Sequence, residues 1–450
     1  MRRMMCAMTW VLVYGLLVAA LAETRAEEPK TKKPFNFEEA SKNVPKPREL
    51  YPLVKKDMVP MDLQILSDKI VPSDTDPSKK LRKITAKFHS IRLENKTWIH
   101  PCTIFIPADN SINETPERRG KVAIVSSPGW VMDDAHVEMY GEPIVSKTNY
   151  PTMVMASPGY YADGRGIEGD IAVLDRMRKR TGKNYYNMNC QLALVYIQAM
   201  NAMEKILGID KVKAVVGGHS KRGRSATVAA AMDPRVAGVV IMGNEGVYRT
   251  DQIQWHLSFH HAFFQEQVHV PVLYIGTTNE GGYKMFNVNL MQERLKRPMT
   301  IEMIPNYRHY NFHEKQYADF MMWVSHVFDD RPISKISDLS FERRNGRNYY
   351  RAKVDSKAKI RLVRVWYTYV DSPQWNRNMW YEWLMAKRGD YYETSVPGDK
   401  PDAYLIEVAD TALGVPGYVT SLPQKISDKP VADRDLSNTP WAGLRKKGRD

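Results

Sequence analysis

Between residues 84 and 332, short runs of apolar residues alternate with longer segments in which apolar residues recur every three or four positions. The short runs are rich in Val, Ile, Leu and Met and are nearly continuous, which is typical of parallel strands buried on both faces. They cover residues 103–107, 121–126, 152–157, 212–217, 236–242, 270–276 and 299–304. The pattern predicts strands that pair in one mostly parallel sheet.

The longer segments predict helices between these strands. Apolar residues at 188, 192, 195, 199, 203 and 206 lie on one helical face, and Gly208 ends the pattern. A second face of this kind runs from Tyr317 to Phe328. Because strands and helices alternate, we predict a doubly wound α/β sheet as the fold of residues 84–332.

After Pro332 the pattern changes to β-rich runs at residues 360–370, 379–385, 391–396 and 403–408. Turn-forming residues at 372–373, 388–390 and 397–399 separate them, which favours a small antiparallel β-sandwich over residues 333–426. Residues 23–83 show little periodicity, so we expect an N-terminal extension that wraps the next domain or is partly disordered. Residues 427–450 are polar and basic and are expected to form a mobile tail.

The amino terminus has the layout of a secretory signal peptide. Arg2 and Arg3 precede an apolar stretch at residues 4–21, and Ala20 and Ala22 flank a cleavage tripeptide. We therefore predict cleavage after residue 22 and secretion, with an uncleaved anchor helix as the alternative. No other stretch reaches the roughly 18 apolar residues that span a bilayer, so no membrane span is expected after cleavage.

Composition indicates a globular protein with a basic surface. Of the 450 residues, 43% are hydrophobic and 26% are charged, and the formal charge is +14. Loss of residues 1–22 removes Arg2 and Arg3 and lowers this charge from +14 to +12. The excess favours either an anionic cell-surface polymer as a partner or simple solubility. No nucleic-acid-reading motif accompanies the charge, so nucleic-acid binding is not expected.

The cysteines and asparagines carry further expectations for an exported chain. Cys102 and Cys190 remain after cleavage and either form a disulfide or stay as buried thiols. Asn95 and Asn113 each begin an Asn-x-Thr acceptor for glycosylation if the host is eukaryotic. No cysteine pair has zinc-ligand spacing and the histidines are scattered, so the sequence predicts neither a metal site nor a cofactor.

The segment 213–232 is typical of a nucleophile elbow. A predicted strand ends in Gly217-Gly218, Ser220 follows at the turn, and an alanine-rich helix begins after it. Gly218 would be required because a side chain there would collide with the next turn. Gly223 stands three residues after the serine where the common motif has two, and an ordinary exposed loop serine is the alternative.

A serine hydroxyl needs a base and an acid, which this kind of fold supplies in the order Ser, acid, His. Glu280 follows the strand predicted at 270–276, and His309 follows the one at 299–304. Both therefore come from loops at strand ends, where they can reach Ser220. Glu245 remains an alternative acid and His313 an alternative base. Structural or capping roles are expected for Asp251, His256, His260 and His261.

Two further features lie near the predicted elbow. The oxyanion of an acyl-transfer reaction needs amide donors, and we expect these from Lys221 and from Gly129 or Trp130, although an ordinary Pro-Gly turn also explains the latter. The side chains of Lys221 and Arg222 either bind an anionic part of the substrate or are solvated. Residues 164–169 spell Gly-x-Gly-x-x-Gly, but the distance from the preceding strand favours a flexible loop over a dinucleotide site.

On these residues the chain resembles the PhoPQ-activated pathogenicity-related family, which includes a secreted autocrine proliferation repressor. The likeness is strongest in Trp98-Ile-His100, in Gly218-His-Ser-Lys-Arg-Gly223 and in Met232-Asp-Pro-Arg-Val236. Glu280 stands where the family usually has Asp, and Arg308 stands where it commonly has Gly before the histidine. The resemblance implies an α/β-hydrolase fold followed by a β-sandwich, export, and a serine hydrolase constellation.

Two functions of different classes follow. The first is a secreted serine hydrolase that cleaves an ester or peptide bond with Ser220, Glu280 and His309. The second is a secreted signalling or adhesion protein that uses the hydrolase-like scaffold to bind a cell-surface receptor, because a fold does not fix a function. Undiminished receptor binding in a Ser220→Ala variant would favour the second.

Overall fold

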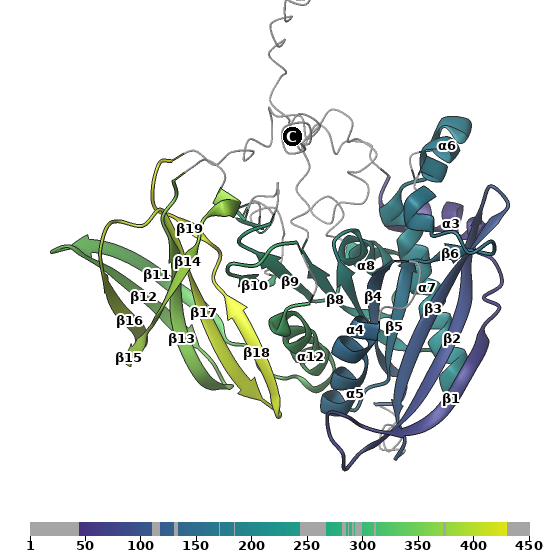
Figure 1. Cartoon of the computed structure of the whole chain (residues 1–450), viewed down its shortest axis with the longest axis horizontal. Coiled ribbons are helices and arrows are strands. Elements are labelled where there is room, and N and C mark those ends of the chain that lie inside the picture. The colour runs from purple at the N-terminus through teal and green to yellow at the C-terminus, as the bar shows by residue number, and fades with distance from the viewer. Residues whose placement is uncertain are drawn as a thin grey trace, which may run out of the picture.

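The computed structural model describes residues 45–109, 118–129, 134–170, 172–183, 185–243, 267–280, 285–286, 288–289, 292, 299–309, 312–371 and 375–429. These residues form an α/β domain and, beside it, a β-sandwich (Figure 1). The predicted architecture, a mostly parallel α/β sheet followed by an antiparallel sandwich, is confirmed.

The main sheet is parallel over its central and C-terminal part and antiparallel at its N-terminal edge. In spatial order it contains β1 (Gln64–Pro72), β2 (Lys80–Leu93), β3 (Lys96–Pro107), β5 (Thr152–Pro158), β4 (Lys121–Gly129), β7 (Lys213–His219), β8 (Val236–Met242), β9 (Val272–Thr277) and β10 (Thr300–Ile304), with β6 (Tyr160–Tyr161) paired to β3. Each apolar run predicted as a strand falls on one of these strands.

Both faces of the sheet are covered, which explains the continuous apolar runs. Along β4, Val122 and Ile124 belong to one hydrophobic core, whereas Ala123 and Val125 belong to the other. The first core takes in side chains of α3 (Pro47–Val54), α6 (Ala172–Thr181), α7 (Met188–Leu207) and α8 (Lys221–Met232). The second contains side chains of the π-helical turn Val137–Gly141, α5 (Glu142–Thr148) and α12 (Glu314–Asp329), and it continues into the sandwich.

The segment 23–83 differs from the extension expected from the sequence. Its described part contains α3 and the whole of β1, and β1 pairs with β2 as the outer strand of the main sheet. Most side chains of β1 are exposed, including Ile65, Leu66 and Ile70. An edge strand that is exposed on both faces has neither a buried run nor an alternating pattern, so its periodicity gives no strand signal.

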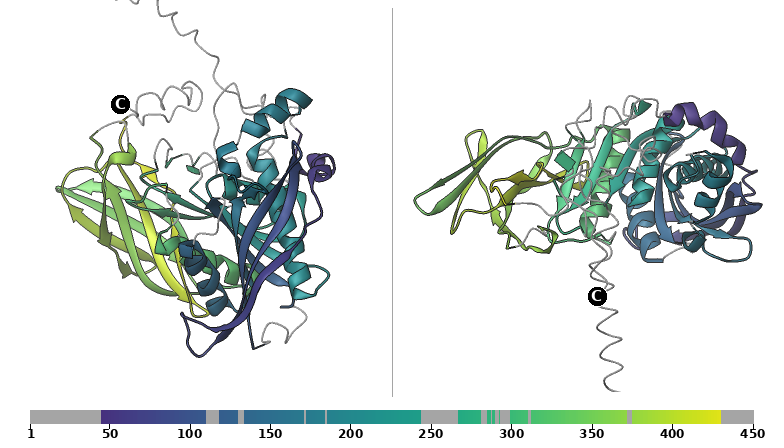
Figure 2. Two further views of the ribbon diagram at one scale, coloured as in Figure 1. Left: turned by 45° about the vertical axis from the view of Figure 1, so that its right-hand side comes forward. Right: turned by 90° about the horizontal axis from the view of Figure 1, so that it is seen from above.

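The C-terminal domain consists of antiparallel strands in two facing sheets, which lie beside β10 in Figure 1. Both views of Figure 2 show this green-to-yellow domain on one side of the α/β domain. One sheet contains β11 (Lys335–Arg344), β12 (Arg347–Asp355), β16 (Tyr391–Pro397) and β15 (Ala386–Arg388). The other contains β14 (Trp380–Leu384), β13 (Lys359–Thr368), β17 (Ala403–Ala412) and β18 (Val415–Thr420), with β19 (Gln424–Lys425) paired to β17. The sequence pattern predicted β13, β14, β16 and β17 but missed the largely exposed β11, and it also missed β12, β15, β18 and β19.

A buried group of charges joins the two domains. Lys315 of α12 donates to Glu302 of β10 at 2.9 Å and to Glu407 of β17 at 2.6 Å. Arg364 of β13 donates to the other oxygen of Glu407 at 2.6 Å. The side chains of Glu302 and Glu407 are fully buried and that of Lys315 is 6% exposed. Because buried charges must be paired, this group ties β10 and α12 to the sandwich.

Glu302 gives this junction a dependence on pH. Burial raises the pKa of Glu302 to about 7, against the attraction of Lys315. A raised carboxyl pKa means that the folded state prefers the protonated form, so this group's stabilising contribution is present below about pH 4.5 and is lost as the pH rises through about 7. A Glu302→Gln variant stays neutral. The measurement is the melting temperature of the variant minus that of the wild type, by calorimetry. We expect this difference to rise by a few degrees from pH 5 to pH 8, and a difference that does not change with pH would contradict the expectation.

The structure bears on the three expectations that accompanied predicted export: a disulfide, glycosylation sites and membrane spans. Cys102 and Cys190 are free, buried thiols, so the disulfide considered from the sequence is not formed. Both sit in the first hydrophobic core, and burial raises the pKa of Cys102 to about 12. Asn95 is exposed in the turn between β2 and β3, whereas Asn113 lies outside the described residues. None of the described helices is long and apolar enough to cross a membrane.

Candidate active site

Ser220 sits in a strained turn between β7 and α8. Its backbone has φ 60° and ψ −128°, and residues other than glycine rarely adopt a positive φ of this kind. The Ser220 amide donates to the carbonyl of Met242 at 2.7 Å, which fixes the turn to the end of β8. The strand, the strained serine and the helix together form the geometry of a nucleophile elbow.

Two glycines allow α8 to pack this closely on β7. A Cβ at Gly218 would lie 2.8 Å from the Cβ of Arg222 and 2.9 Å from the carbonyl oxygen of Ser126. A Cβ at Gly223 would lie 2.5 Å from the carbonyl oxygen of Gly218. All three distances are too short for any side chain. Gly223 therefore serves the close helix–strand contact even though it stands one position later than in the common motif.

Glu280 and His309 are in direct contact. Glu280 belongs to the acid loop (residues 278–280) after β9, and His309 belongs to the histidine loop (residues 305–309) after β10. The Nδ1 atom of His309 pairs with Oε1 of Glu280, and Thr277 donates to Oε2 at 3.0 Å. Glu280 is 1% exposed and His309 is 37% exposed. A carboxylate on Nδ1 favours the tautomer with its proton there and leaves Nε2 to exchange protons.

His219 connects this pair to the elbow. Its ring packs on that of His309, with 4.3 Å between the centroids. At Gly243, the residue after Met242, a Cβ would lie 2.6 Å from Nε2 of His219 and 3.4 Å from Nδ1 of His309. The imidazole of His309 therefore lies against the residue before Ser220. Burial lowers the pKa of His219 well below its usual value, and the neighbouring His309 lowers it further, so His219 is neutral at neutral pH.

The side chains of Lys221 and Arg222 were expected either to bind an anionic part of the substrate or to be solvated, and the structure gives them a third role. Both pair with Glu168, and Arg222 also donates to the carbonyl of Ser157 at 2.6 Å. Arg222 is 4% exposed, so it is neither a solvated charge nor an open anion site. Burial lowers the pKa of Lys221 despite its bond to Glu168. These bonds tie the first turn of α8 to the loop after β6.

Glu168 lies in the Gly-x-Gly-x-x-Gly segment that was predicted to be a flexible loop. Residues Ile167–Asp170 form a 3-10 turn, and the segment supplies the carboxylate for the two cations after Ser220. Sequence reasoning missed this role because Glu168 lies far from Lys221 in the chain and no local motif marks it.

Of the remaining candidate site residues, the structure describes Lys221, Gly129 and His313, and the others lie outside the described residues. The Lys221 amide opens α8, whose positive N-terminal end faces Ser220, and Gly129 ends β4. Nδ1 of His313 accepts a hydrogen bond from the Lys315 amide at 3.2 Å and caps α12, a structural role. Trp130, Glu245, Asp251, His256, His260 and His261 lie outside the described residues.

His100, which carries part of the family resemblance, is a buried structural residue. Its Nε2 lies 2.7 Å from the hydroxyl of Ser90 and its Nδ1 lies 3.1 Å from the carbonyl oxygen of Ala156. Burial lowers its pKa to about 4, so the ring is neutral. Among the described residues, no three His, Cys, Asp or Glu side chains are grouped so that they could hold a metal ion.

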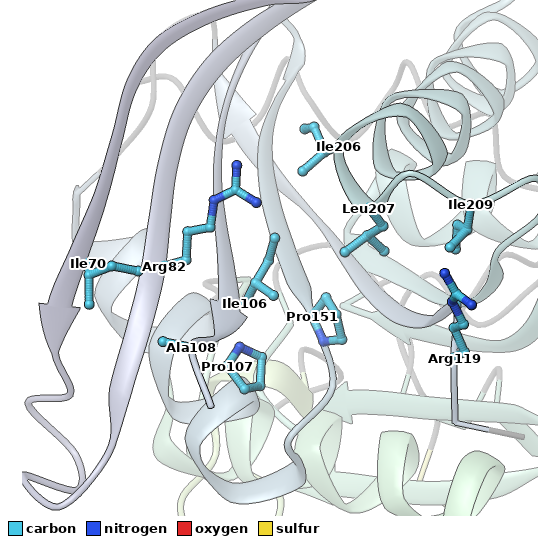
Figure 3. Close-up of a pocket in the computed structure, with 11 residues that line it drawn as sticks. Ile70, Arg82, Ile106, Pro107, Ala108, Arg119, Pro151, Ile206, Leu207 and Ile209 are labelled. Atoms are coloured by element: carbon cyan, nitrogen blue, oxygen red, sulfur yellow. The ribbon is translucent and has the colours of Figure 1, made fainter. Parts of the chain in front are cut away.

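A small cavity of about 190 Å³ lies near the amino-terminal ends of the parallel strands β4 and β5 (Figure 3). Its walls include Gly120 and Pro151, just before β4 and β5, and Leu207 at the end of α7. Ser220, in contrast, follows the carboxyl end of β7. The hollow is therefore separate from the candidate active site. Arg82, which borders the hollow, is paired with Asp68 at 2.6 Å.

No protein-family model and no curated protein sequence matches the chain. Among solved structures, it is similar to a cold-adapted esterase from an Arctic intertidal metagenomic library (14% identity, TM-score 0.40, covering 58% of this chain and 98% of that one). It is also similar to acetyl xylan esterase 1 from Thermoanaerobacterium sp. JW/SL YS485 (12% identity, TM-score 0.42, covering 66% of this chain and 99% of that one). A glucuronoyl esterase from Solibacter usitatus is similar as well (9% identity, TM-score 0.40, covering 63% of this chain and 92% of that one). At these identities and TM-scores, the matches transfer no activity to this chain.

Proposed function

We propose that the protein is a serine hydrolase that cleaves ester bonds, with Ser220 as nucleophile, His309 as base and Glu280 as the acid that orients His309. The observation that carries the proposal is the contact between Glu280 and His309 beside the strained turn of Ser220. These residue types, in this chain order and after the carboxyl ends of β7, β9 and β10, are those that acyl transfer requires.

The reaction follows from these roles. Ser220 Oγ attacks the ester carbonyl carbon while its proton passes to Nε2 of His309. Glu280 stabilises the imidazolium that forms. Amides at the start of α8, including that of Lys221, face the negative oxygen of the tetrahedral intermediate. His309 then gives the proton to the departing alcohol, leaving an acyl-serine that water hydrolyses by the same steps.

Membership of the PhoPQ-activated family and export are parts of the same proposal. They rest on the motifs and on the apolar segment at residues 4–21. Mass spectrometry of the secreted protein from a eukaryotic host tests the second. The expected chain begins at Glu23, and a chain that retains Met1 would contradict cleavage.

The hydrolase proposal is tested with p-nitrophenyl acetate and butyrate, and with peptide anilides to detect amide cleavage. The wild type is expected to turn over the esters, and Ser220→Ala to lower kcat by about 10³-fold or more. Ser337→Ala, at an exposed position in β11, is the control and should match the wild type. Equal rates for the wild type and Ser220→Ala would reject the proposal, and preferential cleavage of anilides would make the protein a peptidase.

A further inference from the structure

The acid loop and the histidine loop are hydrogen-bonded to each other. The amide of Asn279 donates to the carbonyl of Tyr307 at 3.1 Å, and the amide of Asn306 donates to the hydroxyl of Thr278 at 2.9 Å. These bonds involve the residue before Glu280 and residues shortly before His309. The Glu280–His309 pair is therefore carried by one connected unit.

The side chains of the same two asparagines bond to the β-sandwich. Asn306 donates through Nδ2 to the carbonyl of Trp380 at 2.8 Å and accepts through Oδ1 from the Trp380 amide at 2.8 Å. Asn279 donates through Nδ2 to the carbonyls of Asn376 at 3.0 Å and Asn378 at 2.9 Å. Each loop thus has its own attachment to the segment that leads into β14.

The segment 375–380 is held in place by burial and hydrogen bonding. Trp375 and Trp380 are both buried, at 4% and 2% exposure. The ring of Trp375 packs edge-on against Phe286, with 5.1 Å between centroids. Thr368 of β13 donates to the carbonyl of Met379 at 2.7 Å. The sandwich therefore offers fixed backbone groups to the two asparagines.

We propose that Asn306 and Asn279 are positioning residues through which the β-sandwich holds Glu280 and His309 in register with Ser220. The proposal rests on the serine hydrolase function above. Asparagine fits position 306 for two reasons. Asn306 has a φ of 57°, which asparagine tolerates, and its side-chain amide can donate to a backbone carbonyl and accept from a backbone N–H at the same time.

The consequence is a specific kinetic signature. Neither side chain carries the reaction, and the imidazole acts on the proton that moves in the transition state. A looser histidine loop therefore weakens transition-state stabilisation more than substrate binding, so kcat falls while KM changes little. A merely structural role would lower the melting temperature and leave kcat per folded molecule unchanged.

The first test is Asn306→Gly, which removes the side chain but keeps a residue that accepts positive φ. We expect kcat for p-nitrophenyl acetate to fall by roughly 10- to 100-fold, with KM little changed. Asn345→Gly is the matched control, since Asn345 has φ 50° in the exposed turn between β11 and β12. It should keep the wild-type kcat.

Asn279→Ala is the second variant, and it keeps the proposal testable if Asn306→Gly does not fold. A wild-type kcat in a folded variant of either kind, or a rise in KM alone, would overturn the inference while leaving the hydrolase function standing. A wild type no more active than Ser220→Ala would remove the proposed function and this inference with it.

Discussion

Replacing His309 by Ala is expected to lower kcat for ester hydrolysis by about 10³-fold or more, because it removes the imidazole that takes the proton of Ser220. Glu280→Gln should also lower kcat, by about 10²- to 10⁴-fold, because glutamine keeps the volume but loses the charge that orients the imidazole. Initial rates over pH 5 to 9 are the measurement.

His313 provides the matched control for His309. It lies four residues later and caps α12 through its ring. His313→Asn keeps a residue type that caps helices well and should leave kcat unchanged. If His313→Asn lost the activity and His309→Ala retained it, the base would be assigned to the wrong histidine.

Replacing Lys315 by Met is expected to destabilise the protein by about 3–5 kcal/mol, because it leaves Glu302 and Glu407 buried without their shared ammonium group. Urea unfolding followed by circular dichroism at pH 7 measures this. Arg165→Met breaks an ion pair whose side chains are 64% and 49% exposed, and it should change stability little. Equal losses in the two variants would contradict the account of the domain junction.

The sequence predicts well those parts of the fold in which burial is continuous. The parallel strands β4, β5, β7 and β8 are covered on both faces, so their apolar runs are visible without knowing their neighbours. β1 and β11 expose most of their side chains and leave no such mark. Cys102 and Cys190 show the same limit, because their spacing in the chain carries no information on whether they meet.

The candidate site divides in a similar way. Ser220, Glu280 and His309 each follow a strand, and parallel strands bring their carboxyl ends to one edge, so their neighbourhood follows from chain order. Glu168 and the two asparagines act through long-range contacts. The bonds from Asn279 and Asn306 reach residues 376–380 in another domain, and no local pattern indicates them.

The central claim, that Ser220 is an activated nucleophile, is tested most directly by covalent labelling with a fluorophosphonate probe and peptide mapping. The account predicts one modified residue in the wild type, Ser220, with no labelling of Ser220→Ala and a much slower reaction in His309→Ala. Labelling of Ser220→Ala at the wild-type rate, or an unreactive wild type, would contradict it.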